Sequence, residues 1–140
     1  MEILITGGAG FIGSHILEQL NERPDVDVVV FDNLSSGSRD HVPARMELVE
    51  GDVCDEEAVD AVFADHHFDA VVHLAAQTMV PTSVEQPVLD CQINLEGVLH
   101  VLEACRTHGV PHILFSSSAA VYGDNLNIPL EETERLVPTS

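Results

Sequence analysis

The stretch that decides the fold is ILITGGAGFIG, residues 3–13. Its apolar first residues predict a buried strand, and the glycines after them predict a tight turn into a helix. Read from Gly8, the glycines have the spacing G-x-G-x-x-G, in which bare backbone lets a pyrophosphate approach the N–H groups of a helix N-terminus. A plain structural turn can have the same spacing, so the interpretation depends on residues further along the chain.

An acidic residue in the right place supports a dinucleotide site. Asp32 comes 19 residues after Gly13 and directly follows a second apolar strand, residues 28–31. A carboxylate there can bind the hydroxyls of an adenosine ribose. Its charge would repel the 2′-phosphate of NADP, and Arg39, the next arginine, is too far along the chain to offset the repulsion. The sequence therefore predicts a site for NAD.

Strand and helix patterns alternate along the rest of the chain. Shorter apolar strands are predicted at residues 46–50, 70–74 and 112–116, and helices at 11–21, from 55 onward and from about 89 to 108. This alternation predicts the α/β class: a doubly wound parallel sheet (Rossmann fold) of about five strands in the order 3-2-1-4-5. A length of 140 residues suits a single domain, residues 1–140.

The charge of the chain excludes several classes of partner. It carries 24 acidic residues against five arginines and has no lysine, for a formal net charge of −19. Nucleic acids and anionic membranes require basic patches, so neither is an expected partner. The composition resembles that of proteins from halophilic organisms. We therefore expect the melting temperature to rise between low and molar KCl, and a melting temperature that does not rise would contradict a halophilic origin.

The cysteines and histidines predict neither disulfides nor a metal site. Cys54, Cys91 and Cys105 have no C-x-x-C spacing, which favours a reducing, cytoplasmic setting. Cys91 and Cys105 share an apolar helical stripe and are predicted to be core residues. The pair at residues 66–67 is the best candidate for metal ligation, but no third ligand has suitable spacing. No apolar run approaches the 18 residues that would span a membrane.

Motifs along nearly the whole chain resemble the extended short-chain dehydrogenase/reductase family, and within it the UDP-galactose (UDP-glucose) 4-epimerases. They occur in the expected order and are TGGAGFIG at 6–13, DNLSSG at 32–37, GDV at 51–53, HLAA at 73–76, Asn94 with Gly97, and SSSAAVYG at 116–123.

The resemblance implies an NAD site and assigns residues to it. Those implied to surround the pyrophosphate are Gly7, Gly10, Phe11, Ile12 and Gly13. Those implied near the adenosine are Asp32, Asn33, Leu34, Ser35, Ser36, Gly37, Asp52 and Val53. Those implied near the inner part of the cofactor are Leu74, Ala75, Ala76, Gln77, Asn94 and Ser116.

The same resemblance implies the reaction and shows what is missing for it. Epimerases of this kind interconvert UDP-glucose and UDP-galactose by transient oxidation at C4, and Ser118 matches the serine that binds the reacting hydroxyl. Ala119 and Ala120 occupy the positions of the acid and base in related 4,6-dehydratases and can transfer no proton, which argues against that reaction. The family also uses a Tyr-x-x-x-Lys pair, but Tyr122 is the only tyrosine here and is followed at that spacing by Leu126.

The missing pair leaves three hypotheses for function. The first is the NAD-binding N-terminal portion of an epimerase, truncated before the catalytic pair and the sugar-binding domain, so that the chain alone is catalytically incomplete. The second is a non-catalytic module that binds or senses NAD. The third is a half-enzyme completed in trans by a chain that carries the tyrosine and lysine. In each case the uncovered fifth strand, at residues 113–115, is expected to drive homo-oligomerisation through the sheet edge.

Overall fold

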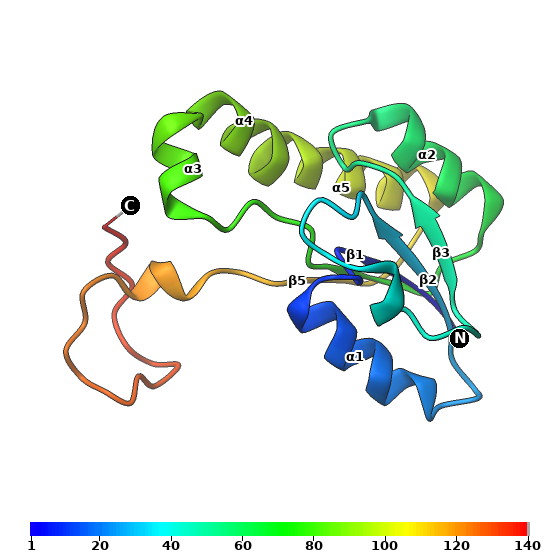
Figure 1. Cartoon of the computed structure of the whole chain (residues 1–140), viewed down its shortest axis with the longest axis horizontal. Helices are drawn as coiled ribbons and strands as arrows, with labels where there is room; N and C mark the ends of the chain where they lie inside the picture. Colours follow the sequence, from blue (N-terminus) through cyan, green and yellow to red (C-terminus); the bar gives the residue numbers. More distant parts are fainter. Residues whose placement is uncertain (140) are drawn as a thin grey trace.

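A computed structural model describes residues 1–139. Five parallel strands form one sheet in the order β3-β2-β1-β4-β5 (Figure 1). The strands are β1 (Glu2–Thr6), β2 (Asp27–Asp32), β3 (Glu47–Glu50), β4 (Ala70–His73) and β5 (Ile113–Phe115). The predicted fold class and strand order are confirmed, and the order changes direction between β1 and β4, where open parallel sheets bind their ligands.

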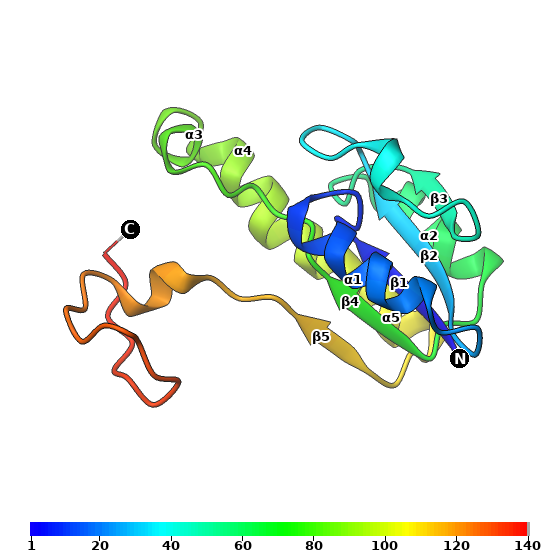
Figure 2. The same ribbon diagram turned by 60° about the horizontal axis from the view of Figure 1, so that its bottom comes forward.

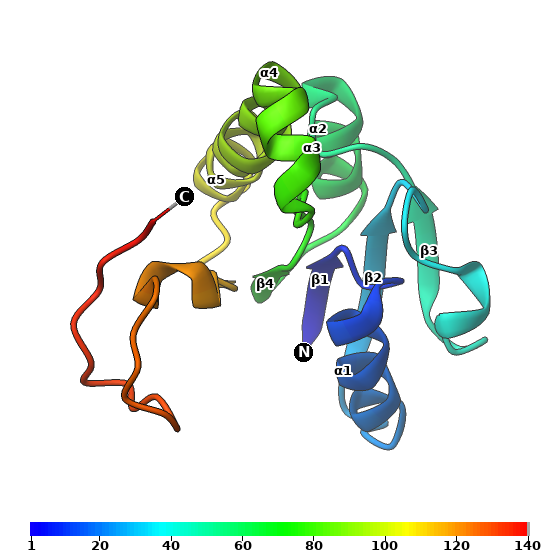
Figure 3. The same ribbon diagram turned by 60° about the vertical axis from the view of Figure 1, so that its left-hand side comes forward.

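Helices cover both faces of the sheet, with α1 alone on one face and α2 and α5 together on the other (Figure 3). The helices are α1 (Phe11–Asn21), η1 (Arg39–His41), α2 (Glu56–Asp65), α3 (Val80–Glu85), α4 (Pro87–Cys91), η2 (Gln92–Glu96), α5 (Gly97–His108) and η3 (Ala119–Tyr122). The helix predicted at 89–108 is present, but η2 is a turn of π-helix within it. Gly109 ends α5 in the left-handed conformation, at φ 72°.

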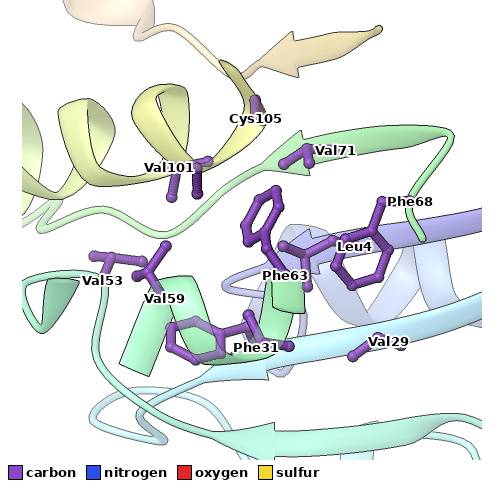
Figure 4. Packing of buried hydrophobic residues seen from close by; sticks show 12 residues of the cluster. Leu4, Val29, Phe31, Val53, Val59, Phe63, Phe68, Val71, Val101 and Cys105 are labelled. Carbon is purple, nitrogen blue, oxygen red and sulfur yellow. The ribbon is translucent and has the colours of Figure 1, made fainter. Parts of the chain in front are cut away.

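The core has two halves because successive strand residues point to opposite faces. Leu4 and Phe31 pack toward α2 and α5, where they meet Phe63 (Figure 4). Ile5 packs on the other face with Leu17 of α1. Apolar residues that follow one another in the central strands are therefore all buried, as expected for a parallel sheet covered on both sides.

The edge of the sheet formed by β5 is less well covered than the central strands. Ile113, Leu114 and Phe115 of β5 are 40%, 59% and 55% exposed. The chain after β5 extends away from the sheet (Figures 1 and 2).

The prediction that Cys91 is a core residue is wrong, because Cys91 lies on an exposed face of the α4–α5 run, whereas Cys105 is buried as expected. Within residues 1–139, no helix has the length and apolar character needed to cross a membrane.

Candidate dinucleotide site

The glycine turn between β1 and α1 requires residues without side chains at two positions. Gly7 has φ +69°, and a Cβ there would lie 2.6 Å from the backbone nitrogen of Ala75. A Cβ on Gly13 would lie 2.4 Å from the carbonyl oxygen of Gly8. The turn therefore packs backbone against backbone, both with the loop after β4 and within the start of α1.

The N-terminus of α1 is the best-suited place for an anion. Its N-cap, Gly10, provides no side-chain hydrogen bond, and the first turn contains no acidic residue. By contrast, the side chain of Asp55 caps α2, and two acids follow it there. Free N–H groups and the positive end of the helix dipole favour a negatively charged group. In a chain with 24 acidic residues, an acid-free helix start fits a bound pyrophosphate.

Asp32 lies where the turn meets the loop after β2. Its carboxylate accepts hydrogen bonds from the backbone N–H of Ala9 at 2.9 Å and of Leu34 at 2.8 Å. The residue is only 8% exposed, yet a carboxylate has further lone pairs with which it can accept bonds from ribose hydroxyls. Arg39 donates to Glu50 at 2.7 Å and so already has an acidic partner. This arrangement favours a ribose without a 2′-phosphate.

The loop after β2 wraps around the glycine turn. Leu34 has a positive φ of 56°, which is unusual for a residue with a side chain and often marks a functional loop. The N–H of Ser35 donates to Asn33 Oδ1 at 3.0 Å, and the loop continues through Ser36. Gly37 packs so closely on Ala9 that a Cβ there would lie 2.7 Å from the Ala9 carbonyl carbon.

A hydrogen bond joins this loop to the end of β3. Asn33 Nδ2 donates to Asp52 Oδ2 at 2.9 Å, and the N–H of Cys54 donates to Asp52 Oδ1 at the same distance. Burial, the largest influence, acts to raise the pKa of Asp52, but these hydrogen bonds outweigh it, and the pKa is lowered. Burial and the neighbouring Asp52 raise the pKa of Cys54 to about 11. The side chain of Val53 is buried against Gly97, so only its backbone can face a ligand.

The loop after β4, which includes Leu74, Ala75, Ala76 and Gln77, lies on the other side of the turn. The N–H of Leu74 donates to the carbonyl of Thr6 at 3.0 Å, and the N–H of Ala75 donates to Thr6 Oγ1 at 3.3 Å. The predicted Asn94 contacts the far end of this loop, at Gln77. The structure thus brings the three loops implied for the cofactor to the carboxyl ends of β1, β2 and β4.

His73 is a buried histidine that supports the same junction. It is 2% exposed, and its ring stacks on Phe115 with centroids 5.8 Å apart. Thr6 Oγ1 accepts a hydrogen bond from Ala75, so its own hydrogen is free to donate to His73 Nδ1, 2.8 Å away. Burial lowers the pKa of His73 to about 4. The ring is therefore neutral at pH 7, as a structural histidine and not a general base.

This burial predicts a pH dependence of folding. The pKa of His73 is about 4 in the folded chain and 6.5 when unperturbed, so the unfolded chain binds more protons between those values. Stability is then complete above pH 6.5 and falls as the pH drops toward 4, by about 3 kcal/mol from this residue. Urea unfolding from pH 4 to 7 should show a smaller loss for His73→Gln than for the wild type. The exposed His67 supplies the control His67→Gln, which should behave as the wild type.

The two serines of the predicted site lie beyond β5. The N–H of Ser116 donates to the carbonyl of His73 at 3.2 Å and keeps the chain beside β4. Ser118 is exposed, and its Oγ accepts a hydrogen bond from the N–H of Ala120 at 3.2 Å, as the cap of η3. In this structure Ser118 therefore has a local capping role, and its predicted role toward a substrate hydroxyl stays a prediction.

Two residues of the site are missing from the sequence-based set. Ala9 is fully buried, and its backbone bonds to Asp32 and to His41 Nδ1. Asp90 bonds to both Gln77 and Asn94. The sequence gives no clear signal for Asp90, because the polar residues Gln92 and Glu96 in the same stretch of helix make no such contact with the loop within residues 1–139.

Comparisons with known proteins agree with this geometry. The sequence pattern of the NAD dependent epimerase/dehydratase family matches residues 3–140. A UDP-glucose 4-epimerase of Azospirillum brasilense is 43% identical over 97% of this chain and 39% of its own length. The structure of the Thermus thermophilus UDP-glucose 4-epimerase in complex with NAD is 45% identical, with a TM-score of 0.91, over 100% of this chain and 45% of that one.

A second solved structure, the UDP-glucose 4-epimerase of Thermotoga maritima with UDP-glucose, is 41% identical with a TM-score of 0.89, and it matches 99% of this chain and 45% of that one. The chain thus spans about two fifths of the length of the relatives that it matches. The family pattern covers nearly every residue and agrees with the glycine turn and the sheet order. The chain therefore belongs to the NAD dependent epimerase/dehydratase family.

Proposed function

We propose that this chain is the NAD-binding portion of a nucleotide-sugar 4-epimerase that interconverts UDP-glucose and UDP-galactose. The observation that carries the proposal is the uncapped, acid-free start of α1 behind the glycine turn, with the carboxylate of Asp32 beside it. The 4-epimerase relatives support the choice of reaction. A groove between α2 and α5 is an unsuitable alternative, because its acidic residues Glu56, Glu57, Asp60 and Glu103 would repel a pyrophosphate.

The chain's own residues divide the work of binding the dinucleotide. The backbone at Gly7–Gly13 binds the pyrophosphate, and Asp32 with Asn33 binds the adenosine ribose. The backbone at Asp52–Val53 borders the adenine, while the loop 74–77 and Asn94 border the nicotinamide half. When bound, NAD supplies a reversible acceptor for the hydride at C4 of the sugar. Ser118 orients the sugar hydroxyl once a substrate occupies the site.

Proton transfer requires groups that this chain does not contain. A phenol with an ordinary pKa near 10 is a weak base at neutral pH, and a lysine would have to lower that pKa. The chain has no lysine. We therefore propose that the chain binds NAD but does not turn over UDP-galactose by itself. Activity requires a polypeptide that supplies the tyrosine and lysine.

Titration calorimetry with NAD and NADP tests the proposal. NAD should bind with one site per chain and at least tenfold more tightly than NADP, because Asp32 repels the 2′-phosphate. At one hundred times its Kd, NAD should add about 2.7 kcal/mol to the free energy of unfolding. An absence of binding at millimolar NAD would reject the proposal. Epimerisation of UDP-galactose by the pure chain would reject the proposal that the chain is catalytically incomplete. It would not contradict the proposal that the chain binds NAD.

We also propose that the chain forms homo-oligomers through β5. Three consecutive exposed apolar residues on a sheet edge favour pairing with a second strand. Sedimentation at tens of micromolar should show a species larger than the monomer. Leu114→Glu, which places a charge on that edge, should shift the protein toward the monomer. A wild type that sediments as a monomer would contradict this surface.

For the setting, we propose a reducing compartment such as the cytoplasm. The three cysteines are unpaired, and Cys105 is buried without a sulfur partner. Burial raises the pKa of the Cys105 thiol, so it stays protonated and unreactive.

A further inference from the structure

The loop between β4 and α3 is anchored at two ends by different elements. At its start, the backbone of Leu74 and Ala75 bonds to Thr6 of β1. At its far end, the N–H of Gln77 donates to Asn94 Oδ1, and Asn94 Nδ2 donates to the Gln77 carbonyl, both at 2.9 Å. The far end therefore depends on the π-helix η2, which contains Asn94, and not on the sheet.

Asp90 lies at the centre of the second anchor. Its Oδ1 accepts hydrogen bonds from Gln77 Nε2 at 2.7 Å and from Asn94 Nδ2 at 3.1 Å. The amide of Gln77 also donates to the Met79 carbonyl at 3.1 Å and accepts a bond from the Met79 N–H. All four polar groups of Gln77 are thus engaged, and Asp90 is the charged partner among them.

The chemistry of a carboxylate determines how the Asn94 amide is oriented. An ionised carboxylate only accepts hydrogen bonds, so Asn94 must point Nδ2 at Asp90 and Oδ1 at the N–H of Gln77. The reversed amide would place Oδ1 against two acceptors, Asp90 Oδ1 and the Gln77 carbonyl. These groups are part-buried, so placing acceptor against acceptor is unfavourable, and Asp90 favours the orientation in which Asn94 bonds to the loop.

We propose that Asp90 is a positioning residue of the cofactor site, which sets the affinity for NAD by holding the loop 74–79 in place through Gln77 and Asn94. The inference rests on the proposed function, because NAD is taken as the ligand. The loop packs against Gly7 at its other end, where a Cβ would meet Ala75. A loop that is released at Gln77 therefore also loosens one side of the glycine turn.

Three variants test the role of the Asp90 oxygen. Asp90→Leu removes the acceptor at similar volume, and the Kd for NAD should rise about tenfold or more in calorimetry. Asp90→Asn keeps an acceptor oxygen without the charge, and its Kd should stay within about threefold of the wild type. Glu85→Leu replaces an exposed acid in α3 as the matched control and should leave the Kd unchanged. Equal affinity of Asp90→Leu and the wild type would overturn the proposal, as would equal weakening in Asp90→Asn.

Amide hydrogen exchange in the NAD-free protein separates this proposal from the proposed function. In Asp90→Leu, the amides of Gln77 and Met79 should exchange at least tenfold faster, while those of β1 keep their wild-type rates. Should Asp90→Leu not fold, Gln77→Met removes the same contact from the other side and should release the Met79 amide. Unchanged exchange would overturn the anchor even if NAD binds. Wild-type protein that does not bind NAD would reject the proposed function and with it any role of Asp90 in affinity.

Discussion

Replacing Gly7 by alanine is expected to weaken NAD binding by at least 100-fold and to lower the free energy of unfolding by about 2–5 kcal/mol. The new Cβ would lie 2.6 Å from the Ala75 nitrogen, and the backbone would keep a φ of +69°. The left-handed conformation costs about 1–2 kcal/mol for a residue with a side chain, and the overlap with backbone adds about 1–3 kcal/mol. Urea unfolding measures the loss of stability, and calorimetry measures the loss of affinity.

Gly109 provides a matched control for the glycine at the turn. Its φ of +72° is nearly the same, but a Cβ there would have nothing within 4 Å. Gly109→Ala should therefore lose only the conformational part, about 1–2 kcal/mol, and keep the wild-type Kd for NAD. If Gly7→Ala loses no more stability than Gly109→Ala and binds NAD equally well, the close approach of the two loops is not required for the site.

The second large effect is expected for Asp32→Asn. Each carboxylate oxygen of Asp32 accepts a hydrogen bond from one backbone N–H, that of Ala9 or that of Leu34. In Asp32→Asn an NH₂ group replaces one of these oxygens, so one backbone N–H then faces another donor. Either the buried N–H of Ala9 or the part-buried N–H of Leu34 loses its acceptor, which should cost about 1–3 kcal/mol of folding free energy. The ribose hydroxyls also lose a charged acceptor, so the Kd for NAD should rise about 10- to 100-fold.

The selectivity for NAD over NADP should fall in the same variant, because the charge that repels the 2′-phosphate is gone. Asp27→Asn is the matched control, since it removes an exposed carboxylate at the other end of the same strand. It should change neither stability nor affinity by a measurable amount. An Asp32→Asn variant that binds NAD as tightly as Asp27→Asn would remove the ribose from the proposed contacts of Asp32.

Much of this fold is predictable from the sequence because the pattern repeats in a simple way. Alternating apolar strands and helices, together with the switch that places β1 in the centre, predict the order 3-2-1-4-5, and the structure has it. The glycine turn and Asp32 are predictable for a different reason. The glycine turn is required for a close approach of backbone, and Asp32 for a carboxylate directly after a strand. Both requirements are local, and the chain meets them within residues 3–32.

Features that depend on contacts between distant segments are not predictable in this way. The helical stripe that contains Cys91 is as apolar as a buried one, but the pattern does not indicate whether another element covers it, and Cys91 is exposed. The π turn at Asn94 cannot be predicted from helix propensity, because it accompanies hydrogen bonds between the Asn94 side chain and the backbone of Gln77, 17 residues away in sequence. Asp90 is missed for the same reason.

An NMR titration of ¹⁵N-labelled protein with NAD tests most directly whether the glycine turn and the start of α1 bind a dinucleotide. Binding there predicts saturable shifts that are concentrated at the amides of residues 7–13, 32–37 and 74–77, which surround the carboxyl ends of β1, β2 and β4. Amides along the acidic groove between α2 and α5 should not move. Shifts confined to that groove, or no saturable shift at millimolar NAD, would contradict a dinucleotide site at the glycine turn.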